Sequence, residues 1–296
     1  MRAQAQLKVS RPLGGRAYDS RANIGDNHAP RCGLEGGHAQ WCLDHVRDAP
    51  PVAFRDTPKA VYLVSTAAFP AGEDKVSVDV EVGPGAVLPV RSAASMIAWA
   101  SSGSSFDVEA TVGAGGALDW QLKPLIASGA CSFAQRARVR MHEGSTLLWV
   151  EELVLGRSGE RPGLLDLRLD VDVVGRPLLR HQLVLGRGVF GWDSPAVLGA
   201  NRAISLVLLA DPALAASETA RPGRVAGEGW AIMALEGPGV LAAAVGRHLS
   251  AARAAMGEGL ALWTEKAVPG TLVLSWADGS LQVGRRGSSG HPTALT

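Results

Sequence analysis

Two groups of side chains in this sequence have the chemistry to hold a metal ion. The first lies near the amino terminus and consists of His28, Cys32, His38, Cys42 and His45. Thiolate sulfur and imidazole nitrogen are both good ligands for Zn²⁺ or Ni²⁺. Their spacing matches no zinc-finger or zinc-ribbon pattern, however, and the surrounding glycines raise the cost of ordering the ligands. Two interpretations stay open, a metal site and incidental side chains on a flexible arm, and we favour the second.

The second group is acidic and lies at the ends of expected strands. Its members are Glu73, Asp74, Asp119, Glu151 and Glu152. Taken singly, each is best interpreted as a solvated charge at a turn. If several of them face the interior together, they must be paired, hydrated or exchanging a cation, because an uncompensated buried carboxylate is strongly disfavoured. An inward-facing set would therefore indicate ion handling.

The sequence lacks the motifs of the common enzyme classes. It contains no GxSxG elbow, no P-loop, no dinucleotide-binding glycine fingerprint and no HExxH helix. The glycine clusters that are present precede expected strands, whereas a phosphate site requires a following helix. We therefore interpret these glycine clusters as turns.

Composition limits the classes of binding partner and the cellular compartment that we expect. With 29 Lys and Arg against 28 Asp and Glu, the net charge of +1 provides no field to attract nucleic acid or an acidic membrane. We find neither an apolar signal-peptide core nor a membrane-spanning run, so we expect a cytoplasmic protein. Three cysteines are too few for a disulfide framework in a chain of this length, and we expect free thiols.

The elements that would position these side chains are strands. Between residues 76 and 185, four segments alternate apolar and polar residues with period two, and each ends at a glycine. These glycines, Gly83, Gly113, Gly144 and Gly175, are separated by 30, 31 and 31 residues. Such a period is typical of stacked units that cover one another's apolar faces. We therefore predict a mostly β fold, an elongated β-solenoid-like stack, in preference to a β-sandwich.

The flanks of this repeat are less regular. We expect residues 1–50 to be poorly ordered or loosely packed, residues 51–283 to form a single β-rich domain, and residues 284–296 to be a disordered tail. Apolar residues at helical spacing predict a helix over about 240–264. A shorter helix is predicted across residues 212–221.

Several stretches between residues 60 and 187 resemble the UreD family, also called UreH. They are the turn ending at Asp74, the strand end at residues 82–86, the segment around Ser95, the segment 116–124 that contains Trp120, and the segment 152–160 that contains Gly156 and Arg157. The last two stretches account for most of the resemblance. Several glycines and a lysine of the family pattern are missing, so a divergent or inactive family member is an alternative.

The resemblance implies an elongated β-stack without catalytic turnover. It implies a scaffold that binds the urease apoprotein and UreF, and through UreF the GTPase UreG, to assist nickel insertion into urease. Nickel would pass transiently through a hydrated interior, with no permanently bound cofactor. Asp74, Asp119, Glu151 and Glu152 are the candidate residues for that passage, because oxygen donors release Ni²⁺ readily. Ser95, Trp120, Gly156 and Arg157 would have structural or partner-binding roles.

One enzymatic alternative remains. A β-solenoid can present paired carboxylates on one face, so a polysaccharide-acting enzyme is the competing hypothesis. Such an enzyme needs export, for which the sequence shows no signal.

Overall fold

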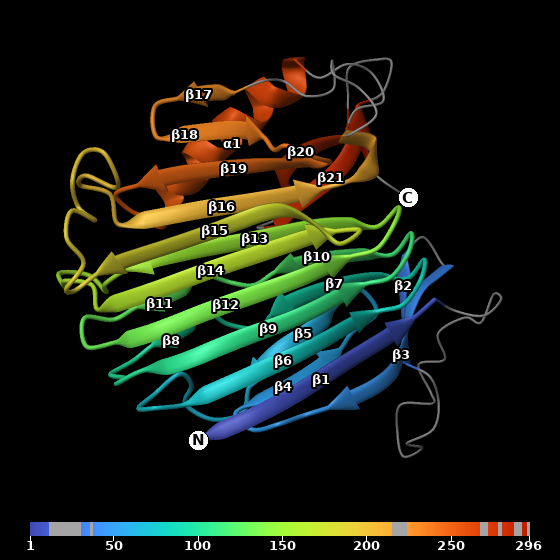
Figure 1. The fold of residues 1–296 in the computed structure, drawn as a ribbon, viewed down its shortest axis with the longest axis horizontal. Helices are drawn as coiled ribbons and strands as arrows, with labels where there is room; N and C mark the ends of the chain where they lie inside the picture. The colour runs from blue at the N-terminus through green and yellow to red at the C-terminus, as the bar shows by residue number, and fades with distance from the viewer. Residues whose placement is uncertain are drawn as a thin grey trace.

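The computed structural model describes residues 1–11, 31–35, 38–214, 224–266, 272–277, 280–286 and 292–294. These residues form two large facing sheets, a small third sheet and one α-helix (Figure 1). Sheet A contains β1 (Arg2–Ser10), β2 (Arg31–Glu35), β3 (His38–Arg47), β6 (Lys75–Val82), β9 (Ser104–Val112), β12 (Ser132–Met141), β14 (Leu164–Val173) and β15 (Arg176–Gly186).

Sheet B is longer than sheet A. It contains β4 (Val52–Asp56), β5 (Val61–Ser65), β7 (Val87–Ser92), β8 (Met96–Ala98), β10 (Ala117–Gln121), β11 (Leu125–Ala127), β13 (Thr146–Leu155), β16 (Ala203–Ala210), β17 (Val225–Gly227), β18 (Trp230–Ala234) and β19 (Gly239–Gly246). The third sheet contains β20 (Leu272–Ala277), β21 (Ser280–Arg286) and β22 (Pro292–Ala294). A single 3₁₀ turn, η1 (Pro212–Leu214), and the helix α1 (Leu249–Lys266) complete the described elements.

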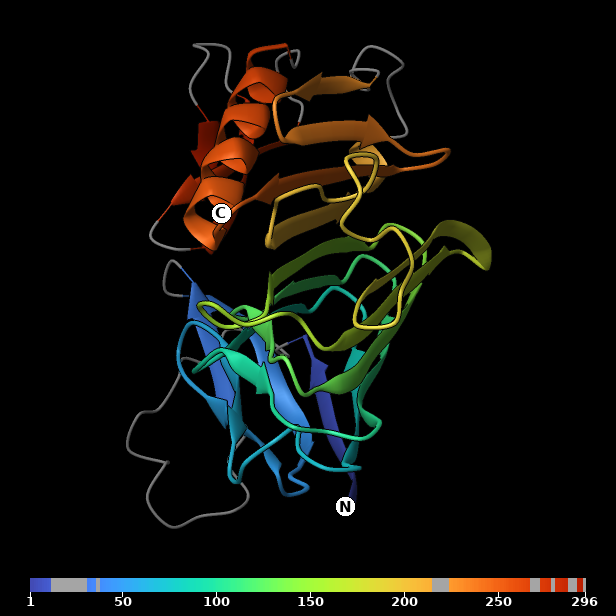
Figure 2. The same ribbon diagram turned by 90° about the vertical axis from the view of Figure 1, so that its left-hand side faces the viewer.

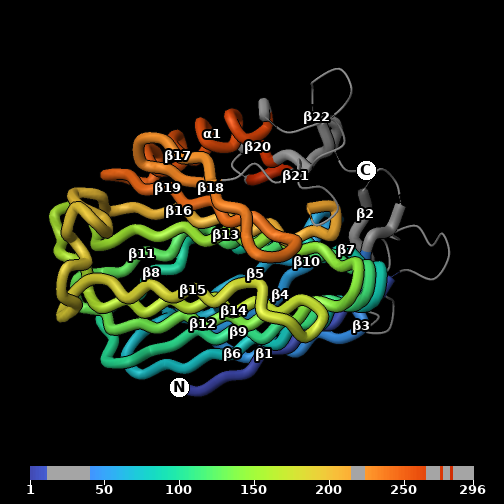
Figure 3. The backbone as a smooth tube through the Cα atoms, turned by 45° about the horizontal axis from the view of Figure 1, so that its top comes forward, coloured from blue at the N-terminus to red at the C-terminus, as the bar shows by residue number. Residues whose placement is uncertain are grey.

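The repeat in the sequence corresponds to successive coils of the chain. Each coil places one strand in sheet A and the next in sheet B, and equivalent strands pair in parallel (Figure 3). In sheet A, Val82 lies beside Val112, and Val112 lies beside Met141, so the coils stack in register. The predicted β-solenoid-like body is therefore confirmed.

Glycine is required at the turns between the two strands of a coil. Gly85 and Gly115 both have φ +63, and Gly144 has φ +70, a region that other residues rarely adopt. Glycine is required at position 113 for a different reason. A Cβ there would lie 2.8 Å from the backbone nitrogen of Pro84 in the neighbouring coil. The periodic glycines therefore serve both the turn and the close approach of neighbouring coils.

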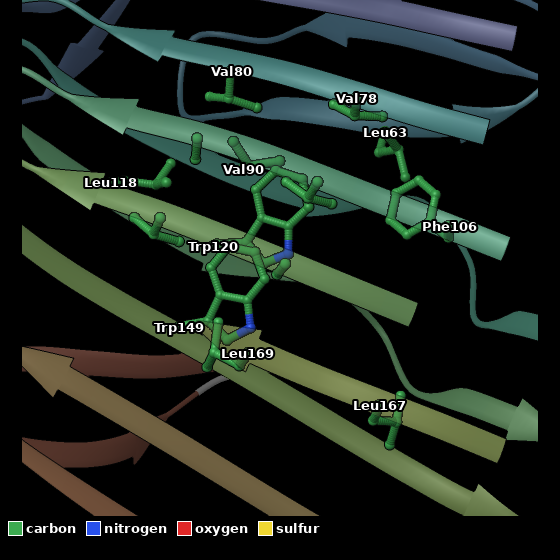
Figure 4. Close-up of a cluster of buried hydrophobic side chains, with 14 of the residues drawn as sticks. Leu63, Val78, Val80, Val90, Phe106, Leu118, Trp120, Trp149, Leu167 and Leu169 are labelled. Carbon is green, nitrogen blue, oxygen red and sulfur yellow. The ribbon is translucent and has the colours of Figure 1, made fainter. Parts of the chain in front are cut away.

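The main core lies between the two sheets. Alternation along each strand sends every second side chain inward, as with Leu118 and Trp120 on β10 and Leu147 and Trp149 on β13. Trp120 and Trp149 stack with ring centroids 5.0 Å apart and an interplanar angle of 4° (Figure 4). This stack joins two adjacent coils in the middle of the body.

A second core lies on the outer face of sheet B, beneath α1 (Figure 2). Met256, Leu260 and Trp263 of α1 pack there against strand residues such as Leu148 and Val150. The small third sheet is attached nearby through the buried side chain of Gln121, which donates to the carbonyl of Leu281 at 2.8 Å. The side-chain oxygen of Gln121 also accepts a hydrogen bond from the backbone N–H of Leu281 at 2.9 Å.

The predicted helix over 240–264 begins too early. Residues 239–246 are strand β19, and α1 begins at Leu249, where the ring of His248 accepts a hydrogen bond from the N–H of Ala251 at 3.2 Å. Leu241 and Val245 have helical spacing, but both faces of β19 are covered, by the body on one side and α1 on the other. An apolar strand covered on both faces does not alternate with polar residues. The predicted helix at 212–221 is described only as the turn η1, and residues 215–221 lie outside the described residues.

The amino-terminal prediction is wrong for residues 2–10. This segment is β1, which lies within sheet A between β6 and β3, with Ala5, Leu7 and Val9 buried. The alternation of apolar and polar residues in β1 is short, but its inward apolar side chains lie beside those of β6. The predicted tail is also ordered in part, since β21 extends to Arg286 and β22 spans Pro292–Ala294. Within the described residues, no helix is long and apolar enough to cross a membrane.

Candidate functional site

A cavity of about 420 Å³ lies between the sheets of the body. Its wall is mostly apolar and includes Phe69, Met96 and Trp120. Two polar residues on facing strands, Gln135 of β12 and Glu151 of β13, also line it. The lining also includes Lys123, Glu152 and three serines, Ser65, Ser92 and Ser95.

Glu151 is a buried carboxyl with one free oxygen. Its Oε1 atom accepts hydrogen bonds from the indole N–H of Trp149 at 3.0 Å and from the amide of Gln135 at 3.1 Å. Among the described residues, Oε2 has no hydrogen-bond partner. Burial raises the pKa of Glu151, and the two hydrogen bonds only partly oppose this effect. The cavity therefore contains a carboxyl that keeps its proton to a higher pH than an exposed glutamate does.

This raised pKa predicts a specific dependence of stability on pH. Above the ordinary value of 4.5 the unfolded chain loses the Glu151 proton while the folded chain keeps it. The free energy of unfolding should therefore fall as pH rises from about 4.5 towards the folded pKa. Glu151→Gln lacks this titrating group. The free energy of unfolding of the variant, relative to that of the unmodified protein, should therefore increase over the same pH range. Urea unfolding at several pH values measures the difference.

A matched control separates burial from charge. Glu109→Gln removes an exposed carboxylate that pairs with Arg140 at 3.0 Å on the outer face of sheet A. This variant should keep the pH dependence of the unmodified protein. An unchanged pH profile for Glu151→Gln would show that folding does not raise the pKa of Glu151.

The structure does not bring the four predicted passage acids together. Asp74 pairs with the terminal amine of Met1 at 3.0 Å. Asp119 lies on the outer face of sheet B and pairs with Arg91 at 2.5 Å. Of the four carboxyl groups, that of Glu151 lies between the sheets, where Gln135 and Trp149 bind it.

Glu152 is adjacent to Glu151 but points to the opposite face of sheet B. Its two oxygens accept from Nε and Nη2 of Arg253 on α1, both at 2.6 Å. Its side chain is only 3% exposed, so this ion pair connects the body to the helix through a buried contact. Because Glu151 and Glu152 face opposite sides of the strand, they do not form the paired carboxylates that a polysaccharide-cleaving enzyme requires.

The other predicted residues have diverse positions. Ser95 is exposed at the rim of the cavity, and Trp120 is buried in the indole stack. Gly156 has φ +79, and a Cβ there would lie 2.5 Å from the carbonyl oxygen of Glu160. The backbone at position 156 therefore requires glycine.

Arg157 binds an acid that was not among the candidates. Its guanidinium donates to both oxygens of Glu160, at 3.0 and 2.9 Å, and lies 4.5 Å from the ring centroid of Trp99. These hydrogen bonds lower the pKa of Glu160 to about 2. Trp99 is half exposed, so the group forms an ordered surface feature near the cavity rim.

The histidine and cysteine group is only partly described. His28 lies outside the described residues, and for Cys32 and His38 the structure describes the backbone alone. Cys42 is disulfide-bonded, so the expectation of a free thiol is wrong there, and Cys42 cannot supply a thiolate ligand. The backbone of Cys32 lies directly opposite Cys42 in the β2–β3 pair. His45 is exposed on β3.

Among the described cysteine side chains, one is free. Cys131 is buried, and burial raises the pKa of its thiol to about 11, which keeps it neutral. Within the described parts of the chain, no group of three or more His, Cys, Asp or Glu residues is placed to hold a metal ion. The amino-terminal metal site stays a prediction.

Sequence reasoning missed Gln135, Trp149 and Arg253. Gln135 had a detectable signal, because it occupies an inward position between Phe133 and Ala137 on β12, where an apolar residue is expected. A polar residue at such a position indicates a buried hydrogen-bonding partner. Arg253 had no comparable signal, since its partner is 101 residues away in the sequence.

Comparison with known proteins identifies the family of this chain. The chain matches the model of the family described as UreD urease accessory protein over residues 29–273. Urease accessory protein UreD 3 of Streptomyces griseus is 39% identical over 207 residues, covering 66% of this chain and 80% of that protein. Urease accessory protein UreD of Streptomyces avermitilis is 36% identical over 225 residues, covering 73% of this chain and 88% of that protein. The chain therefore belongs to the UreD family of urease accessory proteins.

Proposed function

We propose that this chain is a scaffold for urease maturation. In this role it binds the urease apoprotein and UreF, and through UreF the GTPase UreG, and assists nickel insertion into the urease active site. Family membership and the names of the relatives support this assignment. The proposal places the chain in the cytoplasm, with no nucleic acid or membrane as a partner.

The observation that supports the nickel step is the carboxyl of Glu151, which lines the cavity on the inner side of sheet B beside Gln135. The free Oε2 atom of Glu151 is an oxygen donor that contacts an ion transiently and releases it, because Ni²⁺ is held more weakly by oxygen than by nitrogen or sulfur. The hydrogen bonds from Trp149 and Gln135 fix the orientation of the carboxyl group. Ni²⁺ is then a cargo of the protein and not a resident cofactor.

The raised pKa of Glu151 couples nickel contact to the release of a proton. An ion that binds the carboxylate must displace the proton that burial favours, so nickel contact weakens as pH falls. Asp74, Asp119 and Glu152 are engaged in ion pairs, and we assign them no contact with the ion. Glu151 is thus the one predicted passage residue that we retain.

The test is maturation of urease with the Glu151→Gln variant. The protein is co-expressed with the urease subunits, UreF and UreG, and the nickel content of purified urease is measured by mass spectrometry. We expect severalfold less nickel with Glu151→Gln and a normal content with the control Glu109→Gln. Glu151→Gln should still co-purify with UreF and the urease apoprotein, because Glu151 is buried.

Two results would contradict the proposal separately. Normal nickel loading with Glu151→Gln would remove the passage role of this residue and leave the scaffold role intact. Failure of the unmodified protein to co-purify with UreF or urease would remove the scaffold role.

A further inference from the structure

The cavity of the body opens to solvent where sheet B is interrupted. Residues 93–95 separate β7 from β8, and residues 122–124 separate β10 from β11. These connections lie between the paired segments of the parallel ladder, and residues of both connections line the cavity. All three residues of the first connection are exposed. The mouth of the cavity therefore lies at this break in the sheet.

The wall of the cavity suits an apolar group of moderate size. Most of the residues that line it are apolar, and they include Leu63, Phe69, Met96 and Leu153. Its volume of about 420 Å³ lies within the range of small-molecule sites, about 300–1,000 Å³. Burial of apolar surface against such a wall is favourable, because it removes that surface from water.

One buried acidic oxygen is available in this apolar surrounding. Glu151 is 9% exposed, and its Oε2 atom has no hydrogen-bond partner among the described residues. The donors to its other oxygen, Trp149 and Gln135, are both neutral, so neither offsets the charge of the carboxylate. A buried carboxylate without a counter-charge is costly. A cation that reaches Oε2 would remove this cost.

The other charged residues of the lining do not supply that cation. Lys123 is exposed near the mouth, where water screens its charge. The carboxylate of Glu152 accepts hydrogen bonds from Arg253 on the outer face of sheet B. The charged group that a ligand meets inside the cavity is therefore Glu151.

We propose that this cavity binds a primary ammonium group carried on a short aliphatic chain. The ammonium donates a hydrogen bond to Oε2 of Glu151 and neutralises its charge, while the chain lies against Phe69, Met96 and Leu153. An alcohol of equal length lacks the charge, and a carboxylate is repelled. A ligand bound in this way occupies Oε2 and keeps a nickel ion from that atom. The inference itself does not depend on nickel transfer.

Three probes with the same six-carbon chain test the proposal on the full-length protein. They are n-hexylammonium, n-hexanol and n-hexanoate, which differ only in the head group. By isothermal titration calorimetry at about pH 8, hexylammonium should bind roughly tenfold more tightly than hexanol, because its hydrogen bond to Glu151 is charge-assisted. Hexanoate should bind most weakly. Shortening the chain to n-butylammonium should weaken binding roughly tenfold, because two fewer CH₂ groups are buried.

A variant of the carboxyl assigns this preference to one residue. Glu151→Gln keeps the size of the side chain and removes its charge, so the preference for hexylammonium over hexanol should fall to about twofold or less. The matched control Glu109→Gln, on the outer face of sheet A, should keep the full preference. The comparison of the three probes on the unmodified protein stands without either variant.

Methionine methyl resonances locate the bound probe. Met96 lines the cavity, whereas Met256 is buried in the second core beneath α1. In protein with isotope-labelled methionine methyl groups, hexylammonium should shift the resonance of Met96 and leave that of Met256 unchanged. No binding of hexylammonium, an affinity no greater than that of hexanol, or a shift of Met256 without one of Met96 would overturn the proposal.

A further probe separates two sources of the ammonium group, a free alkylamine and a lysine side chain of a partner protein. Acetyl-lysine methylamide with a free side-chain amine has the same four-carbon chain as n-butylammonium but carries two peptide groups. It should bind severalfold more weakly than n-butylammonium, because these groups lose hydration at the cavity mouth. Equal binding of the two probes would support the site and assign its ammonium to a lysine side chain.

Discussion

Replacing Arg253 with leucine should lower the free energy of unfolding by about 3 kcal/mol, because it leaves the buried carboxylate of Glu152 without its partner. Glu152 is 3% exposed, while Arg253 is 35% exposed, so we take the lower end of the range measured for buried pairs. Arg253 lies on α1 and Glu152 on β13. The loss should therefore include weaker docking of α1 on sheet B. Urea unfolding of the variant measures it.

Two further variants identify the cause of that loss. Changing both residues together, in Glu152→Leu with Arg253→Leu, should recover most of the stability, since the buried charge is then absent. Arg140→Leu removes an equivalent ion pair whose partners, Arg140 and Glu109, are 51% and 49% exposed. That control should cost less than about 1 kcal/mol. Equal losses for Arg253→Leu and Arg140→Leu would show that the contact with Glu152 is not effectively buried.

Trp149→Ala should destabilise the protein by about 3–5 kcal/mol, the usual cost of removing a large buried aromatic side chain. Trp149 is 2% exposed, stacks on Trp120 and donates its N–H to Glu151. The variant thus leaves a cavity, breaks the stack and removes one of two hydrogen bonds to a buried carboxyl. Thermal and urea unfolding measure the total.

The contributions to this loss can be separated. Trp149→Phe keeps most of the ring and removes the N–H, so its smaller loss, about 1–3 kcal/mol, reports mainly the lost hydrogen bond to Glu151, whose Oε1 atom keeps the bond from Gln135. Trp99→Ala is the matched control, because Trp99 is 50% exposed and should cost less than about 1 kcal/mol. A loss for Trp149→Ala no larger than that of Trp99→Ala would contradict the packing of the core.

The coiled body was predictable because one physical pattern recurs. Strands such as β6 and β9 are covered on one face and exposed on the other, so polar and apolar residues alternate, and the turn glycines recur with each coil. β19 was not predictable in this way. Both of its faces are covered, so its apolar run has no polar partner positions, and Leu241 and Val245 match a helix as well as a strand.

The candidate site was only partly predictable. That Glu151 and Glu152 face opposite sides follows from their being neighbours on one strand, and this rule was available from the sequence. The hydrogen-bonding partners of the two acids could not be predicted from the sequence. Gln135 and Arg253 are brought to them by sheet facing and helix docking, which depend on contacts distant in sequence.

The in-register stacking of parallel strands has a consequence for how such proteins change length. Because Val82, Val112 and Met141 occupy equivalent places in successive coils, a duplication or loss of one entire coil would keep every inward residue inward. Insertion of one residue within a strand would instead turn all later side chains of that strand to the wrong face. Lineages of this protein should therefore grow or shrink by whole coils, with small insertions confined to the turns.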